Sequence, residues 1–367
     1  MIYLDYQATT PLAPEVKEAM APWFDKFANP HSPSRWGREA AAAIEVARDQ
    51  VAACLPPAGE VVFTGGATEA LNWALRSAVR ISDRRRVVTV LTEHAAVLDT
   101  CDWLETQGCE VVRLPVGPDG LVALPRVSAA VDERTAVVAV MLVNNEIGVL
   151  QPVAEIAALA HDAGALVLCD AVQGFGRMAI PEGPDLIALS AHKIHGPKGV
   201  GALWAGEGVK LAPMLHGGGQ EKGLRSGTLS PMLVAGFGAA AKLALGRREQ
   251  DHAWVEHLWS CALAALGPAW DVNGSLEHRY RGNLNLFREG LDAARLLADL
   301  RDIAFSLGSA CASGSGRPSH VLRAVGLADR EARSCIRLGF GRYTTEEELV
   351  AACRRIDQTA SAQRSFA

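Results

Sequence analysis

The chain has 367 residues, of which 49% are hydrophobic and 21% charged, and its formal net charge is −5. A chain of this length is too long for one small hydrophobic core, and we predict a globular protein with one large and one smaller domain. The mild negative charge argues against a nucleic-acid partner or an anionic membrane surface. No apolar run reaches the roughly 18–20 residues that cross a bilayer.

The N-terminus, "MIYLDYQATTP", lacks the basic start and the apolar core of a signal peptide, so we expect a cytoplasmic protein. Its eight cysteines are then expected to be reduced thiols. None of them forms a C-x-x-C pair, and we therefore expect no structural zinc.

Between residues 60 and 205, apolar runs alternate with helical patterns. The expected strands are, in chain order, "EVVFT", "RVVTVL", "EVVRLPV", "TAVVAVMLV", "ALVLCD", "DLIALS" and "GVGALW". Continuously apolar strands separated by helices indicate a mainly parallel sheet that is covered on both faces. We predict an α/β fold with a mainly parallel seven-stranded sheet sandwiched by helices. Its ligands should bind beyond the carboxyl ends of the strands.

After a helical stretch at about 230–265 the pattern changes. Short strands such as "NLNLF" and "IAFSLGS" now alternate with polar-faced helices such as "TEEELVAACRRI". This pattern is typical of a smaller α+β domain. We predict a large domain over residues 15–250 and a small domain built from residues 1–14 and 251–367.

The stretch "SAHKIHGPKG" puts Lys193 directly after an expected strand. A lysine amine in such a place can attack a carbonyl, and the aldehyde of pyridoxal phosphate is the obvious one. That cofactor also needs a carboxylate for its ring nitrogen and a cradle for its phosphate. Asp170 ends the strand "ALVLCD", and Gln173 could bond the ring hydroxyl. The glycine turn "TGGATEA" leads into a helix at Ala67 and Thr68, whose N–H groups can bind phosphate.

Three further side chains follow expected strands: Ser190 and His192 as additional donors, and His94 as a group that could lie flat on the cofactor ring. Each signal alone has an ordinary explanation, since "GPKG" can be a plain turn and a strand-end Asp can be a helix cap. A metal at His192 and His195 lacks a carboxylate or Cys at matching spacing. Neither "GGATEA" nor "GPKGVG" fits the dinucleotide-binding pattern G-x-G-x-x-G. Together, and in this order, the residues favour pyridoxal phosphate.

A second nucleophile is Cys311, in the Gly/Ser-rich segment "SLGSACASGSG"; the other seven cysteines lie in apolar contexts. An exposed loop thiol can attack the sulfur of a bound substrate and carry it away as a persulfide. The alternative is a surface cysteine of no consequence. Arg337, in "SCIRLGFG", suits a bidentate grip on an amino-acid carboxylate, although an ion pair at a domain interface explains the bare residue equally well.

Ten motifs follow one another between residues 3 and 348. They are "YLDYQATTP", "FANPHSPSRWGREA", "FTGGATEALN", "TEHAAVLDT", "VNNEIGVLQP", "CDAVQGFG", "SAHKIHGPKGVGALW", "HGGGQEKGLRSGT", "SLGSACASGSGRPSHVLRAVG" and "SCIRLGFGRYTTEEE". In this order they resemble the cysteine desulfurases, a group within the class V aminotransferase branch of fold-type I pyridoxal phosphate enzymes. "GGATEA" and "SAHK" depart from the family's usual pattern by exchanges between small residues.

This resemblance implies that the cofactor aldehyde bonds to Lys193 and that Thr228, in "RSGT", reaches the phosphate of the neighbouring subunit in a homodimer. The cofactor contacts that it implies come from Ala67, Thr68, His94, Asn145, Asp170, Gln173, Ser190 and His192.

We therefore predict a cysteine desulfurase that converts L-cysteine to L-alanine and holds the sulfur on Cys311 as a persulfide. Lys193 removes the α-proton, His94 assists as acid or base, and Asn145 and Arg337 hold the substrate. The sulfur is expected to pass to an acceptor protein, either an iron–sulfur scaffold or a thiolation enzyme.

Two kinds of rival remain open. A selenocysteine lyase or a class V aminotransferase would show selenium-only turnover or keto-acid dependence. A pyridoxal-binding sulfur relay without catalysis would release no alanine from cysteine.

Overall fold

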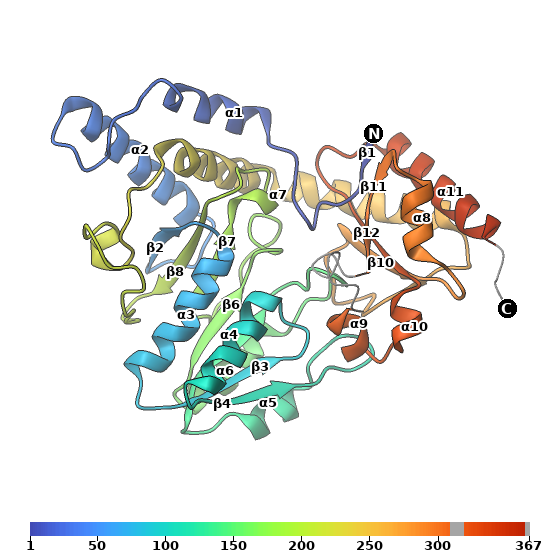
Figure 1. Cartoon of the computed structure of the whole chain (residues 1–367), viewed down its shortest axis with the longest axis horizontal. Coiled ribbons are helices and arrows are strands. Elements are labelled where there is room, and N and C mark those ends of the chain that lie inside the picture. The colour runs from blue at the N-terminus through green and yellow to red at the C-terminus, as the bar shows by residue number, and fades with distance from the viewer. Residues whose placement is uncertain (309–318, 364–367) are drawn as a thin grey trace.

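The centre of the molecule is a seven-stranded sheet in the order β2-β8-β7-β6-β5-β3-β4 (Figure 1). The computed structural model describes residues 1–308 and 319–363. Strand β8 runs antiparallel to both of its neighbours, and the remaining neighbours in the sheet are parallel. The prediction of a mainly parallel seven-stranded sheet is confirmed. Its strands are β2 (Gly59–Thr64), β3 (Arg86–Val90), β4 (Glu110–Leu114), β5 (Thr135–Met141), β6 (Leu166–Asp170), β7 (Leu186–Ser190) and β8 (Gly201–Gly206).

Helices cover both faces of this sheet, because successive residues of each strand point into two different cores. In β7, Ile187 and Leu189 pack into one core, and Leu186 and Ala188 pack into the other. The first core is closed by α2 (Arg35–Ala52), α5 (Leu124–Ala130), α6 (Val153–Asp162) and the first half of α7 (Pro231–Leu266). The second is closed by α3 (Ala67–Ile81) and α4 (Ala95–Thr106).

A smaller part of the molecule has its own sheet and core. Its antiparallel sheet has the order β12 (Ser306–Leu307), β13 (Cys335–Gly339), β10 (Asn283–Phe287) and β9 (Asp271–Val272). The N-terminal strand β1 (Ile2–Tyr3) pairs in parallel with β11 (Ile303–Ala304), which brings the start of the chain into this part. The accompanying helices are α8 (Ala293–Asp299), α9 (His320–Ala324), α10 (Asp329–Ala332) and α11 (Glu346–Ala362).

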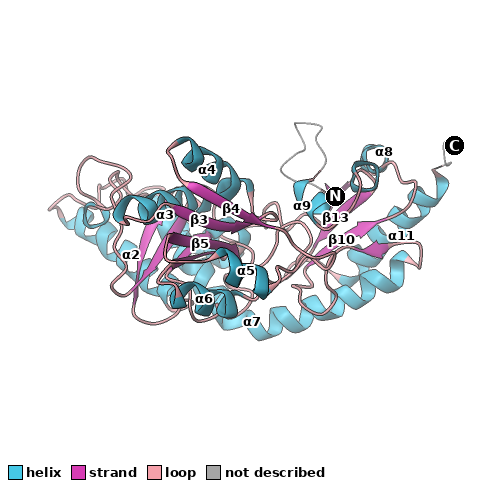
Figure 2. Cartoon of the chain, turned by 90° about the horizontal axis from the view of Figure 1, so that it is seen from below, coloured by secondary structure: helices cyan, strands magenta, loops and turns pink. Residues whose placement is uncertain are grey.

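One helix, α7, runs beneath both parts (Figure 2). Val234 and Phe237 near its start belong to the core of the large sheet, whereas Leu258 and Trp259 near its end belong to the core of the small part. The division into residues 15–250 and residues 1–14 with 251–367 stays a prediction. The separate cores support it.

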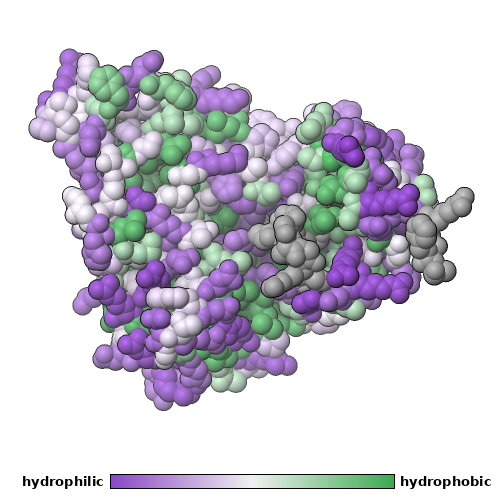
Figure 3. Space-filling view, viewed as in Figure 1, coloured by the Kyte–Doolittle hydropathy of each residue, from purple (hydrophilic) through white to green (hydrophobic). Residues whose placement is uncertain are grey.

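The segment that precedes α2 and the first turn of α2 expose aromatic side chains. It contains α1 (Pro14–Met20) and the short helix η1 (Ala21–Trp23), and hydrophobic residues gather over this corner of the molecule (Figure 3). Phe24, Phe27 and Trp36 are more than half exposed, and the rings of Phe27 and Trp36 meet edge to face. We call these three residues the aromatic patch. Among residues 1–308 and 319–363, no helix has both the length and the apolar character needed to cross a bilayer.

Candidate active site

A cavity of about 480 Å³ lies beyond the carboxyl ends of β6 and β7 and beside the start of α3. Of the residues predicted for the site, Thr228 is exposed and does not line this cavity. Cys311 lies outside the described residues. The structure brings all the others together around the cavity: Ala67, Thr68, His94, Asn145, Asp170, Gln173, Ser190, His192, Lys193 and Arg337.

Lys193 ends a short helix, η2 (Ala191–Lys193), that follows β7 directly. Its ammonium group donates hydrogen bonds to the carbonyl oxygens of Gln7, at 2.5 Å, and Ala8, at 2.8 Å. Its own carbonyl oxygen accepts a hydrogen bond of 2.8 Å from Arg177. The N-terminal segment therefore holds the amine at the cavity wall, although this segment is far from Lys193 in sequence.

Asp170 is the last residue of β6 and is buried. Burial raises the pKa of its carboxyl group, while the charges of His94 and Lys193 and the N–H of Val172 oppose this rise. The Val172 N–H donates to Oδ1 at 3.0 Å. A buried carboxylate is costly without a positive partner, and a protonated ring nitrogen is a partner of the required charge.

Gln173 is fixed through both ends of its amide group. Its Nε2 donates to the carbonyl oxygen of Gln7 at 3.0 Å, and its Oε1 accepts from Arg177 at 2.7 Å. The amide retains a second N–H, because one nitrogen carries two donors. That N–H is available to an oxygen atom in the cavity.

The start of α3 forms an anion-binding cradle. The helix begins at Ala67 after Gly66, and no side chain caps its first N–H groups. Such groups bind anions, and the helix dipole adds to the effect. A Cβ atom at position 201 would lie 2.8 Å from the Cα of Gly66, so only glycine permits this approach of β8 to the cradle. Glu69, in the first turn, is neutralised by Arg225 at 2.8 Å.

Burial disfavours the charged form of both cavity histidines. The backbone N–H of Ala96 donates to Nδ1 of His94 at 3.0 Å, which leaves the proton of the neutral ring on Nε2. Burial lowers the pKa of His94. Burial and the charge of Lys193 lower the pKa of His192 to about 4. His192 Nδ1 lies 3.1 Å from the hydroxyl of Thr9.

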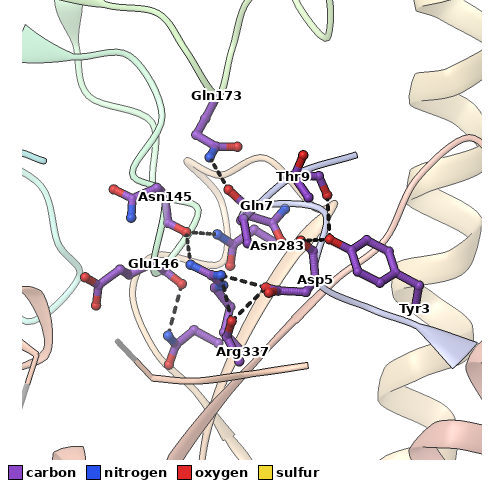
Figure 4. Close-up of polar contacts among 12 residues, drawn as sticks. Tyr3, Asp5, Gln7, Thr9, Asn145, Glu146, Gln173, Asn283 and Arg337 are labelled. Atoms are coloured by element: carbon purple, nitrogen blue, oxygen red, sulfur yellow. Dashed lines mark hydrogen bonds and ion pairs between the residues drawn. The ribbon is translucent and has the colours of Figure 1, made fainter. Parts of the chain in front are cut away.

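Arg337 reaches the cavity from β13 in the small part. Its side chain is fully buried and forms an ion pair of 2.7 Å with Asp5. It also donates to the hydroxyl of Ser306, at 3.1 Å, and to the carbonyl oxygen of Asn145, at 3.0 Å (Figure 4). The guanidinium group therefore joins the N-terminal segment, the small sheet and the loop after β5. Both readings of Arg337, carboxylate grip and structural ion pair, are compatible with this geometry.

Sequence reasoning missed two buried carboxyl groups next to predicted residues. Glu93 precedes His94 and accepts a hydrogen bond of 2.7 Å from the N–H of Met141. Glu146 follows Asn145 and accepts one of 2.5 Å from the hydroxyl of Ser319. The sequence could have indicated both glutamates, because "TEH" and "NNEIG" place each of them next to a residue already assigned to the site.

The family of the chain follows from comparison with known proteins. Residues 2–351 match the family Aminotransferase class-V. The cysteine desulfurase IscS of Rickettsia bellii is 43% identical over 368 residues, which cover 97% of this chain and 90% of the relative. A solved NifS-like protein has a TM-score of 0.91 at 33% identity and covers 99% of this chain and 100% of its own. The structure of SspA in complex with cysteine has a TM-score of 0.83 at 33% identity and covers 94% and 100%.

The fold and the site thus define a class V aminotransferase-type enzyme that depends on pyridoxal 5′-phosphate. Within this class the chain belongs to the cysteine desulfurase family.

The residues around the cavity fit that cofactor. Lys193 offers an amine for the aldehyde, Asp170 a buried carboxylate for the ring nitrogen, and α3 an uncapped N-terminus for the phosphate. The cavity volume is in the ordinary range for a small-molecule site.

Proposed function

We propose that the protein, a cysteine desulfurase, converts L-cysteine to L-alanine and takes the sulfur on Cys311 as a persulfide. The observation that carries the assignment of Cys311 is the anchoring of both flanks of residues 309–318 to the cavity wall. The complex of the related SspA with cysteine supports L-cysteine as the substrate.

Before the segment, Ser306 contacts Arg337, which lines the cavity, and Asp5, the ion-pair partner of Arg337. Its hydroxyl donates to Asp5 at 2.8 Å and accepts from Arg337, which lines the cavity, at 3.1 Å. Five residues of extended chain span at most about 18 Å, which is the length between Ser306 and Cys311. This chain length is compatible with a role of Cys311 at the cavity.

After the segment, Ser319 and His320 are bonded to residues next to the cavity lining. Ser319 bonds to buried Glu146, and Nε2 of His320 donates to the carbonyl oxygen of Glu93 at 2.9 Å. These two glutamates are the chain neighbours of Asn145 and His94, which line the cavity. Displacement of this flank would therefore disturb the residues around the substrate.

The chemistry divides between two nucleophiles. When bound, pyridoxal phosphate draws electrons from the α-carbon of the substrate, which acidifies the α-proton and weakens the Cβ–S bond. Lys193 accepts the α-proton and returns it, because its amine is at the cavity wall. The Cys311 thiolate attacks the substrate sulfur: an S–S bond forms, the Cβ–S bond breaks, and its electron pair and a proton stay with the product as alanine.

The remaining side chains bind and orient. Asp170 would hold the ring nitrogen in its protonated form, and Gln173 would donate to the ring hydroxyl. Asn145 and Arg337 would hold the substrate, with Arg337 gripping its α-carboxylate. His94 would lie against the cofactor ring, and its Nε2 could exchange a proton with the substrate, since Nδ1 accepts from the backbone. Ala67, Thr68, Ser190 and His192 would hold the phosphate.

The working form is proposed to be a homodimer in which Thr228 reaches the phosphate bound by the neighbouring subunit. Thr228 is exposed, as this role requires. The aromatic patch supports an interface between copies, because large exposed aromatic side chains are enriched where proteins meet.

We further propose that the protein works in the cytoplasm and delivers sulfur to an acceptor protein. The name of the Rickettsia relatives, IscS, favours iron–sulfur cluster assembly, and a thiolation enzyme is the second candidate. A selenocysteine lyase or a class V aminotransferase on the same scaffold remains the alternative function.

The deciding experiment replaces Cys311 with serine, which keeps size and polarity but removes the thiolate. The variant should still change its cofactor absorbance on addition of L-cysteine, because this binding step does not use Cys311. It should release alanine and sulfide at least on the order of a hundredfold more slowly. Cysteine treatment of the wild type should add one sulfur to the Cys311 peptide, seen by mass spectrometry. Normal turnover by Cys311→Ser, or a persulfide on Cys335, would contradict the proposal.

A further inference from the structure

Three side chains with metal-binding chemistry meet on the outside of the molecule, away from the cavity. His257 and Cys261 are one turn apart on α7, and Glu346 is the first residue of α11. Their ligand atoms all lie within 4.8 Å of one another. None of the three lines the active-site cavity.

The spacing of the sulfur and nitrogen atoms matches a tetrahedral metal. Cys261 Sγ lies 3.6 Å from His257 Nε2. Bonds of about 2.3 Å to sulfur and about 2.0–2.1 Å to nitrogen at a tetrahedral angle place these two atoms about 3.6 Å apart. The thiol and the imidazole are therefore already at the separation that two ligands of one ion require.

The carboxylate stands at the third position. Glu346 Oε2 and His257 Nε2 are 2.7 Å apart, which is a hydrogen-bond distance. An oxygen and a nitrogen ligand on one zinc ion would lie about 3.3 Å apart. Glu346 Oε2 and His257 Nε2 would therefore move apart by about 0.6 Å when a metal replaces the proton between them. Both side chains are close to half exposed and have room for this shift.

The elements that carry the ligands are fixed relative to one another. The ring of Trp254 stacks on that of His257, with centroids 5.3 Å apart. The indole N–H of Trp254 donates to the carbonyl oxygen of Thr344 at 3.1 Å. Thr345 then caps α11 and sets the position of Glu346. This preorganisation lowers the conformational cost of binding.

We propose that His257, Cys261 and Glu346 bind a divalent zinc ion that joins α7 to α11, with water as the fourth ligand. The combination of thiolate, imidazole and carboxylate selects zinc over magnesium or calcium, which prefer oxygen ligands alone. Three protein ligands leave the fourth position open to solvent, because the site is at the surface. In the part of the chain that the structure describes, His257 is the one ion-pair partner of Glu346.

The test is metal titration of the holoenzyme after removal of metals with a chelator. We expect one tight zinc site per chain, measured by competition with a chromophoric chelator, and tetrahedral ligand-field absorption when Co²⁺ is used instead. Cys261→Ala should weaken zinc binding at least about a hundredfold, because loss of an outer-shell partner alone costs up to that much. His257→Gln and Glu346→Gln should each weaken it as well.

The controls separate this site from the active site. Cys353→Ala removes a buried cysteine of α11 and should leave zinc affinity unchanged. Cys311→Ser should also leave it unchanged, and Cys261→Ala should keep the cofactor absorbance and its response to L-cysteine. Zinc binding that survives Cys261→Ala, or that disappears in Cys311→Ser, would overturn the proposal.

Discussion

The two walls of the active-site cavity are built in different ways. The strand-end wall consists of residues that end or closely follow strands of the large sheet, such as Asp170, Ser190 and Lys193. The N-terminal wall consists of Gln7, Ala8 and Arg337, which reach the cavity from the N-terminal segment and from β13.

The N-terminal wall depends on contacts between residues that are far apart in the sequence. Lys193 meets Gln7 across 186 positions, and Arg337 meets Asp5 across 332. The strand-end wall carries the groups proposed for the cofactor, and the N-terminal wall carries the grip proposed for the substrate. The lesson is that the proposed cofactor residues are placed by strand ends and then fixed by the N-terminal segment, whereas the proposed substrate grip depends on long-range polar contacts alone.

The strongest way to break the strand-end wall is Lys193→Ala. The variant should lose the absorbance of the aldehyde-bound cofactor and about 10⁴-fold or more of its turnover, because no other amine takes over the α-proton. Borohydride reduction of the wild type followed by peptide mapping should find the cofactor on Lys193. A cofactor found on Lys198, which also lines the cavity, would contradict the assignment.

The N-terminal wall is tested by Arg337→Lys, which keeps the charge but loses the planar fork. Removal of a charged hydrogen bond costs about 1.5–3 kcal/mol, so KM for L-cysteine should rise about 10–100-fold. The cofactor absorbance should stay, since the strand-end wall is intact. Arg288→Lys, at an ion pair with Asp357 whose residues do not line the cavity, serves as a control. An unchanged KM would mean that Arg337 serves only its ion pair with Asp5.

The flank of the Cys311 segment gives a smaller effect. Ser319→Ala removes the hydroxyl that caps α9 and bonds to Glu146, and it leaves a buried carboxyl group without this donor. Persulfide formation in a single turnover should slow about tenfold, consistent with a loss of about 1–2 kcal/mol of positioning. The absorbance change on cysteine binding should keep its rate.

Ser34→Ala is the matched control, because Ser34 caps α2 through the same kind of bond to Gly37. Both variants lose a cap worth about 1 kcal/mol of folding free energy. Equal persulfide rates in the two variants would show that Ser319 is structural and does not position the segment.

The smallest expected effect concerns Glu93. Burial raises its pKa well above the ordinary value, and the charge of Asp170 adds to this. Such a group contributes stability that is complete below the unfolded pKa of about 4.3 and is lost as pH rises through the folded pKa. Glu93→Gln cannot lose a proton, so its melting midpoint should exceed that of the wild type by about 1–3 °C at pH 8 and match it at pH 4. Glu207→Gln, at an exposed position, is the control and should melt at the wild-type temperature at both pH values. A constant difference in melting midpoint between Glu93→Gln and the wild type from pH 4 to pH 8 would refute the argument.

How far the sequence predicts this molecule depends on the range of the interactions. The strand-end wall could be predicted, because each of its residues follows an apolar run that only a strand explains. The antiparallel direction of β8 could also have been predicted. Residues 191–200, which connect β7 to β8, are too few for the crossover that two parallel strands need. Gln7 and Ala8 act through backbone oxygens, which no residue pattern marks. The burial of Glu93 and Glu146 depends on packing across the fold, and glutamate is ordinarily exposed.

Helix α7 has a mechanical consequence for the cavity that lies above it. With 36 residues it is about 54 Å long, and its two halves are embedded in different cores. A large rotation of the small part against the large sheet would have to bend this helix, because no loop separates its halves. The large sheet carries the strand-end wall and the small part carries Arg337, so the continuous helix helps to hold these two sides of the cavity in register.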